Sequence, residues 1–353
     1  MSNRKALVVG ATGVTGAPLC EQLLRQGWDV YAISRRIPSV DAAGGNLTHL
    51  PIDLANASAI EEGLGKLKNV THVFYCANAP SQELRQLMIG QLLDVLETLP
   101  HFANINFIQG MKYYGCHLGP FKTPAKETDP RVPGCDFYYT EEDMLVSRQR
   151  GKQWSWSVLR PHSVCGYSAG NPLNVAAAVA LYGSMQSERG ADLGFWGSEK
   201  QFNSLFQVAD ASLLARASIH ISTTAACRNT AFNINNGEPF RWSAIWPALA
   251  EAFGLKAAGP QNYVSMQYFT DFAPVWEAMT AKHGLKKFPY DRLPRWCLGE
   301  YTAPNGRLAC DYDLFADTTR LRQSGFTEVL DNRDMFLNIF AELRKQHVIP
   351  QRQ

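Results

Sequence analysis

The chain has 353 residues, of which 46% are hydrophobic and 19% are charged, and its formal net charge is +2. This length suffices for a large buried core, and the composition is that of a globular enzyme. So small a net charge gives no reason to expect nucleic-acid binding. The longest weakly polar run, residues 175–182, is far below the ~20 residues of a membrane span, and no secretion signal is apparent. A cytoplasmic protein without a membrane partner is therefore expected.

The eight cysteines show no Cys-x-x-Cys spacing. We expect reduced, mostly buried thiols and neither a disulfide framework nor a metal site.

The first half of the chain alternates short apolar runs, typical of strands buried on both faces, with apolar residues at helical spacing. The expected strands cover residues 6–9, 30–33, 47–52, 70–75, 105–108 and 156–159. The expected helices cover a segment that ends at a Gly27 cap, residues 84–99 and residues 138–150. This alternation predicts an α/β fold of the Rossmann type, a doubly wound parallel sheet.

After Arg160 the alternation loosens. We expect a helix at about residues 174–187, one more core strand at 230–235, and a helix over 244–253 that Ser243 caps. The C-terminal third, from residue 263 onward, is expected to be helical and is rich in aromatic residues.

A glycine-rich turn follows the first predicted strand and opens the first helix. It reads Gly10-Ala11-Thr12-Gly13-Val14-Thr15-Gly16. Glycines at this spacing allow a tight turn and close approach of the backbone to a pyrophosphate, and the helix N-terminus supplies N–H donors. We therefore expect a dinucleotide to bind here; the alternative is a turn without a ligand. The predicted contacts are Gly10, Thr12, Gly13, Val14 and Gly16.

The end of the second predicted strand, Ser34-Arg35-Arg36, indicates which dinucleotide binds. An NAD enzyme would prefer an acidic residue there, whereas guanidinium groups can bind a 2′-phosphate. We therefore expect NADPH/NADP+ as the cofactor, with a solvated basic loop as the alternative. Asp53 is placed to accept a hydrogen bond from the adenine amino group, or else to cap a helix. Further predicted cofactor contacts at strand ends are Leu54, Cys76, Ala77, Pro161 and Val164.

These features predict two regions. An NADP(H)-binding Rossmann domain covers residues 1–165, with a further core segment near 203–237. A smaller, mostly helical substrate-capping region covers residues 166–202 and 238–353.

The segment 137–143, Phe-Tyr-Tyr-Thr-Glu-Glu-Asp, stands where a reductase of this fold keeps a catalytic tyrosine. The usual Tyr-x-x-x-Lys pattern places a lysine one helical turn later, facing the tyrosine. Here Glu142 follows Tyr138 at that spacing, and Asp143 follows Tyr139. Lys112 comes after the fifth predicted strand, whose carboxyl end borders the same crevice, so its side chain can supply the missing ammonium group.

Four segments resemble the progesterone 5β-reductase/iridoid synthase-like (PRISE) family of atypical short-chain dehydrogenases/reductases. That family carries Lys-His-Tyr, then Gly-Pro-Phe, then Asn-Phe-Tyr-Tyr-x-x-Glu-Asp, then Trp-Ser-x-x-Arg-Pro. The chain departs from this pattern because Asp136 replaces the asparagine, Tyr113 replaces the histidine, and residues 115–117 are extra. The matching segments are Lys112-Tyr113-Tyr114, Leu118-Gly119-Pro120-Phe121, residues 137–143, and Trp156-Ser157-Val158-Leu159-Arg160-Pro161-His162.

The resemblance implies NADPH-dependent reduction of the C=C bond of a small apolar α,β-unsaturated carbonyl, an enone or enal. It implies that Tyr139 is the catalytic tyrosine and that Lys112 is its lysine. A tyrosine hydroxyl can stabilise the enolate oxygen on which charge develops after hydride reaches the β-carbon. Two alternatives stay open: an NADP-dependent carbonyl reductase or epimerase of the same fold, and a protein that senses NADP(H) without turnover. A homodimer is compatible with the sequence.

Overall fold

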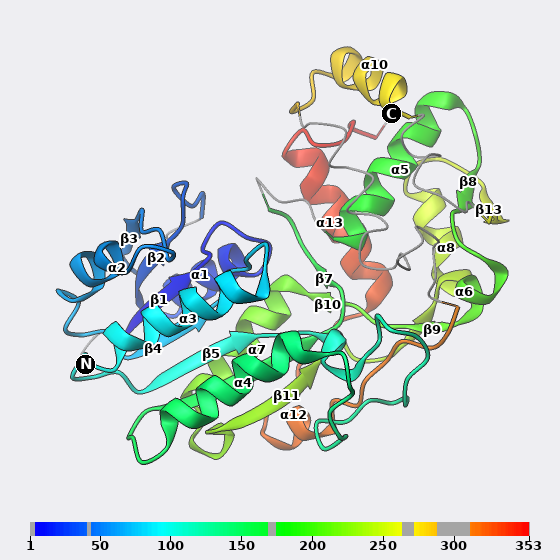
Figure 1. Ribbon diagram of the computed structural model, residues 1–353. Coiled ribbons are helices and arrows are strands. Elements are labelled where there is room, and N and C mark those ends of the chain that lie inside the picture. Colours follow the sequence, from blue (N-terminus) through cyan, green and yellow to red (C-terminus); the bar gives the residue numbers. More distant parts are fainter. Residues whose placement is uncertain (1–3, 41–43, 169–173, 263–271, 288–310, 353) are drawn as a thin grey trace.

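The computed structural model describes residues 4–40, 44–168, 174–262, 272–287 and 311–352. At its centre is a seven-stranded parallel sheet with the strand order β11-β6-β5-β4-β1-β2-β3 (Figure 1). The predicted Rossmann-type sheet is therefore confirmed. Its strands are β1 (Lys5–Val9), β2 (Asp29–Ile33), β3 (Leu47–Leu50), β4 (His72–Tyr75), β5 (Asn104–Ile108), β6 (Ser155–Pro161) and β11 (Thr230–Ile234).

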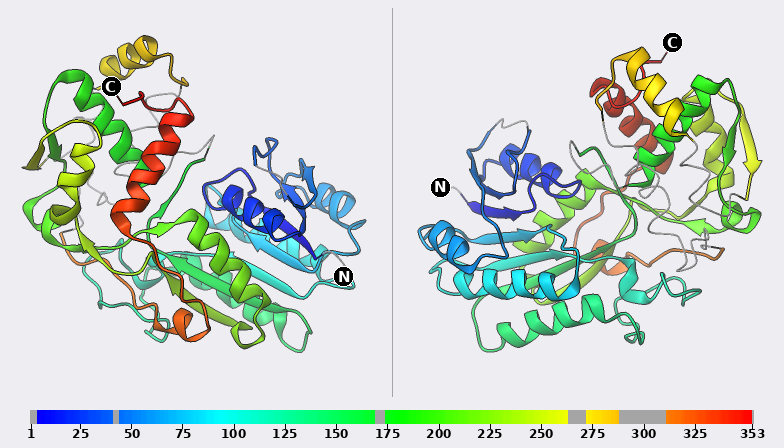
Figure 2. Two further views of the ribbon diagram at one scale, coloured as in Figure 1. Left: turned by 180° about the vertical axis from the view of Figure 1, so that it is seen from behind. Right: turned by 45° about the horizontal axis from the view of Figure 1, so that its top comes forward.

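Helices cover both faces of this sheet, which explains why β1, β4, β5, β6 and β11 are almost entirely buried. Alternate residues of β1 point to opposite faces. Ala6 and Val8 pack with α1 (Gly16–Arg25) and α7 (Ala211–Thr223). Leu7 and Val9 pack with residues of the helices on the other face. Figure 2 shows helices lying along both faces of the sheet. Those helices are α2 (Ala57–Leu64), α3 (Gln82–Leu96) and α4 (Asp136–Gln149).

The order of the strands reverses at β1, because β2 and β3 lie on one side of it and β4, β5 and β6 on the other. The crevice outside the carboxyl ends of the strands at such a switch point is where ligands bind in open parallel sheets. The glycine-rich turn, the end of β4 and the segment after β5 all meet there.

The rest of the chain forms a second region with its own apolar core, rich in aromatic side chains. In this region α13 packs against α5 and α8 (Figures 1 and 2). Its helices are α5 (Val175–Arg189), α6 (Glu199–Asn203), α8 (Trp242–Glu251), α10 (Ala273–His283) and α13 (Asn332–Lys345). Three two-stranded sheets complete it: β7 (Val164–Cys165) with β10 (Ala209–Asp210), β8 (Leu193–Phe195) with β13 (Ala257–Pro260), and β9 (Leu205–Phe206) with β12 (Phe240–Arg241).

Late in the sequence the chain returns to the sheet. In and after α12 (Thr319–Gln323), Leu321 and Phe326 join the buried cluster that contains Phe232 and Ile234 of β11. Part of the expected capping region therefore packs on the Rossmann sheet. Two single-turn 3-10 helices, η1 (Met111–Tyr114) and η2 (Ala225–Cys227), complete the elements.

The predicted caps at Gly27 and Ser243 can be compared with the helix ends. Gly27 ends α1 as expected: it directly follows the C-cap Gln26 and has a φ of +75°, a conformation that glycine adopts without strain. The predicted Ser243 cap is wrong: α8 begins at Trp242, and its N-cap Arg241 makes no side-chain capping bond.

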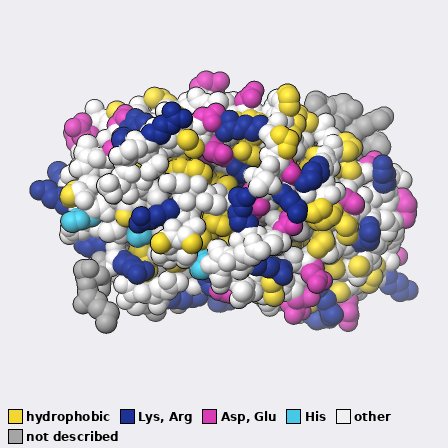
Figure 3. All heavy atoms as spheres, turned by 90° about the horizontal axis from the view of Figure 1, so that it is seen from below, with side chains coloured by type: hydrophobic (Ala, Val, Ile, Leu, Met, Phe, Trp, Pro, Cys, Tyr) yellow, Lys and Arg dark blue, Asp and Glu magenta, His cyan; other side chains and the backbone are white. Residues whose placement is uncertain are grey.

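The described helices include none that is long and apolar enough to cross a membrane. Within the same part of the chain, no group of three or more histidine, cysteine or acidic residues could hold a metal ion. Its six cysteines are free thiols, four of them buried, whereas Cys297 and Cys310 lie outside the described residues. On the face shown in Figure 3, basic and acidic side chains are interspersed.

Candidate active site

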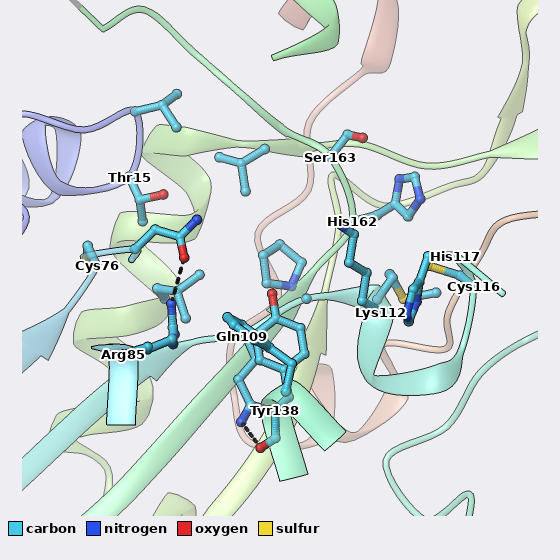
Figure 4. Close-up of a pocket in the computed structure, with 18 of the residues that line it drawn as sticks. Thr15, Cys76, Arg85, Gln109, Lys112, Cys116, His117, Tyr138, His162 and Ser163 are labelled. Atoms are coloured by element: carbon cyan, nitrogen blue, oxygen red, sulfur yellow. Dashed lines mark hydrogen bonds between the residues drawn. The ribbon is translucent and has the colours of Figure 1, made fainter. Parts of the chain in front are cut away.

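A pocket of about 560 Å³ opens at the switch point of the sheet (Figure 4). Its walls come from the glycine-rich turn, the end of β4, the end of β5 with η1, the start of α4, and the segment after β6. Of the predicted site residues, it brings together Val14, Cys76, Ala77, Lys112, Pro161 and Val164.

The glycine-rich turn is tight enough to exclude side chains at two positions. Gly10 has a φ of +84°, and a Cβ there would lie 2.8 Å from the backbone nitrogen of Ala77. A Cβ on Gly16 would lie 2.2 Å from the carbonyl oxygen of Gly10. A Cβ on Gly13 would have no neighbour closer than 3.4 Å, so packing within the chain leaves space there. This geometry fits a turn that accepts a pyrophosphate against its backbone.

The basic residues after β2 are available to an anion. Ser34 is buried, and its hydroxyl donates to the carbonyl oxygen of Arg36 at 2.6 Å. The Ser34 carbonyl in turn lies 2.8 Å from Nε2 of His49. Arg35 and Arg36 are exposed, and neither guanidinium group forms an ion pair with a carboxylate of the described residues. Ser34 thus shapes the turn, and the two guanidinium groups can bind a phosphate.

Asp53 lies exposed after β3, where its carboxylate accepts a hydrogen bond from the Ala55 nitrogen at 3.0 Å. The alternative that it caps a helix is wrong, because the N-cap of α2 is Asn56, whose side chain accepts from the Ala59 nitrogen.

The Leu54 side chain is buried in the apolar core and does not line the pocket. The carbonyl of Thr12 accepts a hydrogen bond from Ser168 at 3.0 Å.

The two adjacent tyrosines of α4 point in different directions. Tyr138 lines the pocket, with its hydroxyl oxygen beside Gly110, where an added Cβ would be 3.3 Å away (Figure 4). Tyr139 is buried outside it. Its hydroxyl donates to the carbonyl oxygen of Tyr113 at 2.6 Å and accepts from the Val132 nitrogen at 2.7 Å. The prediction of a catalytic Tyr139 disagrees with this placement, because both hydrogen bonds tie its hydroxyl to the backbone.

Lys112 lies on η1 and is exposed at the pocket wall, next to Cys116 and His117 in Figure 4. Its ammonium group forms no ion pair with the described residues. Burial, and to a lesser degree the positive charge of Lys112, lower the pKa of His117. The structure therefore brings Lys112 together with Tyr138 and not with Tyr139.

Glu142, which stands where the helical lysine of Tyr-x-x-x-Lys would be, faces away from the pocket. One carboxylate oxygen accepts from Nη2 of Arg160 at 2.5 Å. Arg160 is only 1% exposed and donates from Nε to Oε1 of Gln109 at 3.1 Å. Gln109 donates in turn to the backbone carbonyl of Tyr138 at 3.3 Å. The carboxylate thus compensates a buried arginine beneath the site, a role that a lysine at this position would oppose.

His162 contacts the pocket but is held neutral. Its Nδ1 lies 2.6 Å from the carbonyl oxygen of Gln207, and burial lowers its pKa to about 4. Its ring packs edge-on against Phe206. The imidazole is thus uncharged near neutral pH.

The sequence reasoning missed a buried ion pair beside the pocket, between Arg85 of α3 and Glu141 of α4, whose Nε and Oε2 atoms are 2.6 Å apart. A signal was present in the sequence. Arg85 lies four residues before Ile89 and seven before Leu92, so it interrupts the apolar face of its helix.

Two family models match the chain. The model of the PRISE-like Rossmann-fold domain matches residues 53–350, and that of the NAD dependent epimerase/dehydratase family matches residues 6–89. The short chain dehydrogenase gsfE of Penicillium aethiopicum is 28% identical, over 98% of this chain and 99% of that protein. The (S)-8-oxocitronellyl enol synthase of Antirrhinum majus is 27% identical, over 98% of this chain and 92% of that protein.

Solved structures share the fold at low sequence identity. A putative epimerase from Burkholderia cenocepacia has a TM-score of 0.69 and 15% identity, covering 97% of this chain and 98% of that one. The UDP-glucose 4-epimerase of Thermus thermophilus, in complex with NAD, has a TM-score of 0.66 and 16% identity, covering 96% and 99%.

Together the Rossmann sheet, the glycine-rich turn and these relatives define the class: an NAD(P)-dependent enzyme of the short-chain dehydrogenase/reductase type, with a small-molecule substrate. Within that class, the chain belongs to the PRISE-like family, whose model matches most of its length.

Proposed function

We propose that the protein uses NADPH to reduce the C=C bond of α,β-unsaturated carbonyls. The observation that carries this proposal is the pairing of Tyr138 and Lys112 in one pocket, while Glu142 takes the place of the helical lysine. The (S)-8-oxocitronellyl enol synthases add support, since their name specifies an enol, the protonated form of the enolate that conjugate reduction produces.

The chemistry follows from the two side chains. When bound, NADPH would supply a hydride to the β-carbon and become NADP+. The π electrons would shift to the carbonyl oxygen as an enolate, which would then take a proton from water at the α-carbon to give the saturated carbonyl product. The Tyr138 hydroxyl donates a hydrogen bond to that oxygen, and the Lys112 ammonium adds a positive charge on the same side. Both interactions strengthen as negative charge develops, so they lower the barrier. We propose Tyr138 in place of Tyr139 because only Tyr138 lines the pocket.

For the cofactor, we propose that Gly10, Gly13 and Gly16 receive the pyrophosphate and that Arg35 and Arg36 bind the 2′-phosphate of NADPH. Asp53, Cys76, Ala77, Pro161 and Val164 complete the proposed cofactor contacts. Residues 1–165 with a segment near 203–237 are proposed as the cofactor domain, and the rest as the capping region, except for the part around α12. A cytoplasmic location is part of the same proposal.

Two alternative functions have less support from the structure. The first alternative is a carbonyl reductase or an epimerase. The solved epimerase structures above share the fold of this chain, but at 15% and 16% identity they support the fold alone and not the activity. A sensor that binds NADP(H) without turnover has no need of a tyrosine and a lysine in one pocket, and both line it here.

The test is NADPH oxidation by the purified protein with small enals, enones, a steroid enone and matched saturated ketones, with products identified by mass spectrometry. We expect saturated aldehydes or ketones from the unsaturated substrates. Saturated or allylic alcohols as the only products would show a carbonyl reductase, and cofactor binding without oxidation would support the sensor.

The adjacent tyrosines provide a matched pair of variants. Tyr138→Phe should lower turnover on the order of 10²-fold, because it removes a donor to the developing oxyanion. Tyr139→Phe should leave turnover within a small factor but lower the free energy of unfolding by about 1–3 kcal/mol, because the backbone groups of Tyr113 and Val132 lose their partner. Steady-state kinetics and urea denaturation separate the two effects. Greater loss of turnover in Tyr139→Phe would contradict the assignment.

A further inference from the structure

The ion pair of Arg85 and Glu141 connects two walls of the pocket. Arg85 lies in the first turn of α3, 5% exposed, and lines the pocket, whereas Glu141 belongs to α4 and is 1% exposed. Its Oε2 accepts from Nε of Arg85 at 2.6 Å. Both charges are removed from water, so each depends on the other for compensation.

The opposite edge of the guanidinium group binds the segment that follows β4. Nη1 of Arg85 donates to the carbonyl oxygen of Ala77 at 3.1 Å and to Oδ1 of Asn78 at 3.2 Å (Figure 4). That Oδ1 also accepts from the Ala79 nitrogen at 3.0 Å. The Ala77 nitrogen is the atom that a Cβ on Gly10 would meet. Arg85 thus fixes the strand end that lies against the glycine-rich turn.

Glu141 lies three residues after Tyr138 on α4, close to one helical turn, so the two side chains project from neighbouring positions on the helix. The guanidinium group also lies 5.2 Å from the ring of Phe137, the residue before Tyr138. Through Glu141 and Phe137, Arg85 therefore contacts the first turns of the helix that carries Tyr138.

Stability alone does not account for this pair. Buried ion pairs are often replaced by apolar side chains without loss of stability, since desolvation offsets their attraction. Nη2 of Arg85 is buried and has no hydrogen-bond partner among the described residues, which adds a further cost. The planar guanidinium group nevertheless gives fixed geometry to two separate segments at once.

We propose that Arg85 and Glu141 are positioning residues that hold the cofactor-contacting segment of Ala77 and Asn78 in register with the Tyr138 helix. This inference rests on the proposed use of NADP(H). It explains how Tyr138 and the cofactor are placed relative to each other, because one ion pair contacts the segments that carry both. Loss of the pair then weakens cofactor binding and misplaces the tyrosine relative to the nicotinamide.

The main test is the double variant Arg85→Met/Glu141→Leu, which removes both charges and fills their space with apolar side chains. Titration of NADP+ by intrinsic tryptophan fluorescence measures the dissociation constant without turnover, and thermal unfolding measures stability. We expect the dissociation constant to rise on the order of tenfold and kcat to fall on the order of 10²-fold, as for a reactant misplaced by about 1 Å, with Tm near that of the parent. A dissociation constant and kcat within twofold of the parent would overturn the proposal.

A second variant covers the case in which the double variant does not fold. Arg85→Lys keeps a positive charge for Glu141 but cannot donate in two directions at once, so it should fold and still bind NADP+ more weakly. Unchanged NADP+ binding in Arg85→Lys would also overturn the proposal.

A matched control comes from the same helix pair. Gln86 of α3 donates to the Thr140 hydroxyl of α4 at 2.8 Å, whereas the hydrogen bonds to the Ala77 carbonyl and the Asn78 side chain come from Arg85. Gln86→Ala should leave NADP+ affinity and kcat unchanged; a loss equal to that of the double variant would show that any α3–α4 contact suffices and would overturn the specific role of Arg85. Failure of the parent protein to bind NADP+ at all would instead refute the proposed function.

Discussion

At the scale of single residues, Glu142 occupies the position of the lysine in the Tyr-x-x-x-Lys pattern. An acidic residue at this position suggests that the activity has been lost, but the structure gives it another role. In the fold it pairs with Arg160, which is buried beneath the pocket and shares a hydrogen-bond chain with Gln109 and the backbone of Tyr138. Lys112, on a different element, brings a positive charge to the wall of the pocket, which Arg85 also lines.

Glu142→Gln should destabilise the fold, because it leaves the Arg160 charge buried without a counter-ion. We expect a loss of about 3 kcal/mol in the free energy of unfolding, measured by urea denaturation. The neighbouring Asp143→Asn is the control: its ion pair with Arg131 is at the surface, so its loss should cost less than 1 kcal/mol. Equal effects of the two substitutions would contradict this account.

At the scale of elements, α3 and α5 each have a glycine near the middle, and the space around these two glycines differs. Gly90 lies in the middle of α3, and a Cβ there would have no neighbour within 4 Å. Gly183 lies in the middle of α5, and a Cβ there would lie 2.5 Å from the Phe253 ring. Helix propensity favours alanine at both positions, but packing permits it at only one.

Gly90→Ala should therefore raise the free energy of unfolding by about 0.5–1 kcal/mol. Gly183→Ala should lower it by about 1–3 kcal/mol, because α5 and the Phe253 ring must move apart. The sign of the change in denaturation midpoint checks both. Stabilisation by Gly183→Ala would mean that the second region is packed less tightly than the structure indicates.

At the scale of the whole molecule, the strand order of the sheet assembles the site. Segments that are distant in the chain meet at one edge: the glycine-rich turn after β1, Cys76 and Ala77 after β4, Lys112 after β5 and Pro161 at the end of β6. Arg35 and Arg36 follow β2 on the other side of β1. A dinucleotide that extends across this edge would contact the ends of several strands of one sheet, so its binding should stabilise the folded state.

NADP+ at a hundred times its dissociation constant should add about 2.7 kcal/mol to the stability of the folded state. The resulting rise in Tm is measurable by calorimetry. The double variant Arg35→Ala/Arg36→Ala should lose most of the rise with NADP+ and keep the smaller rise with NAD+, because only NADP+ carries the 2′-phosphate. An equal reduction with both cofactors would contradict the 2′-phosphate role of these arginines.

Local patterns in the sequence were sufficient to predict the parallel sheet, the helices α1, α3 and α4, the glycine-rich turn and the family, because apolar periodicity, glycine spacing and motif order are local properties of the chain. The sequence also located Lys112 correctly at the crevice, since the ends of parallel strands meet at one edge. Which of the two tyrosines lines the pocket follows only from the folded structure, because it depends on the rotation of α4 about its axis, set by the packing of Tyr139 against Tyr113. Likewise, the partners of Glu142 and Arg85 lie on other elements, at 18 and 56 residues' distance in the chain, where no local pattern reaches.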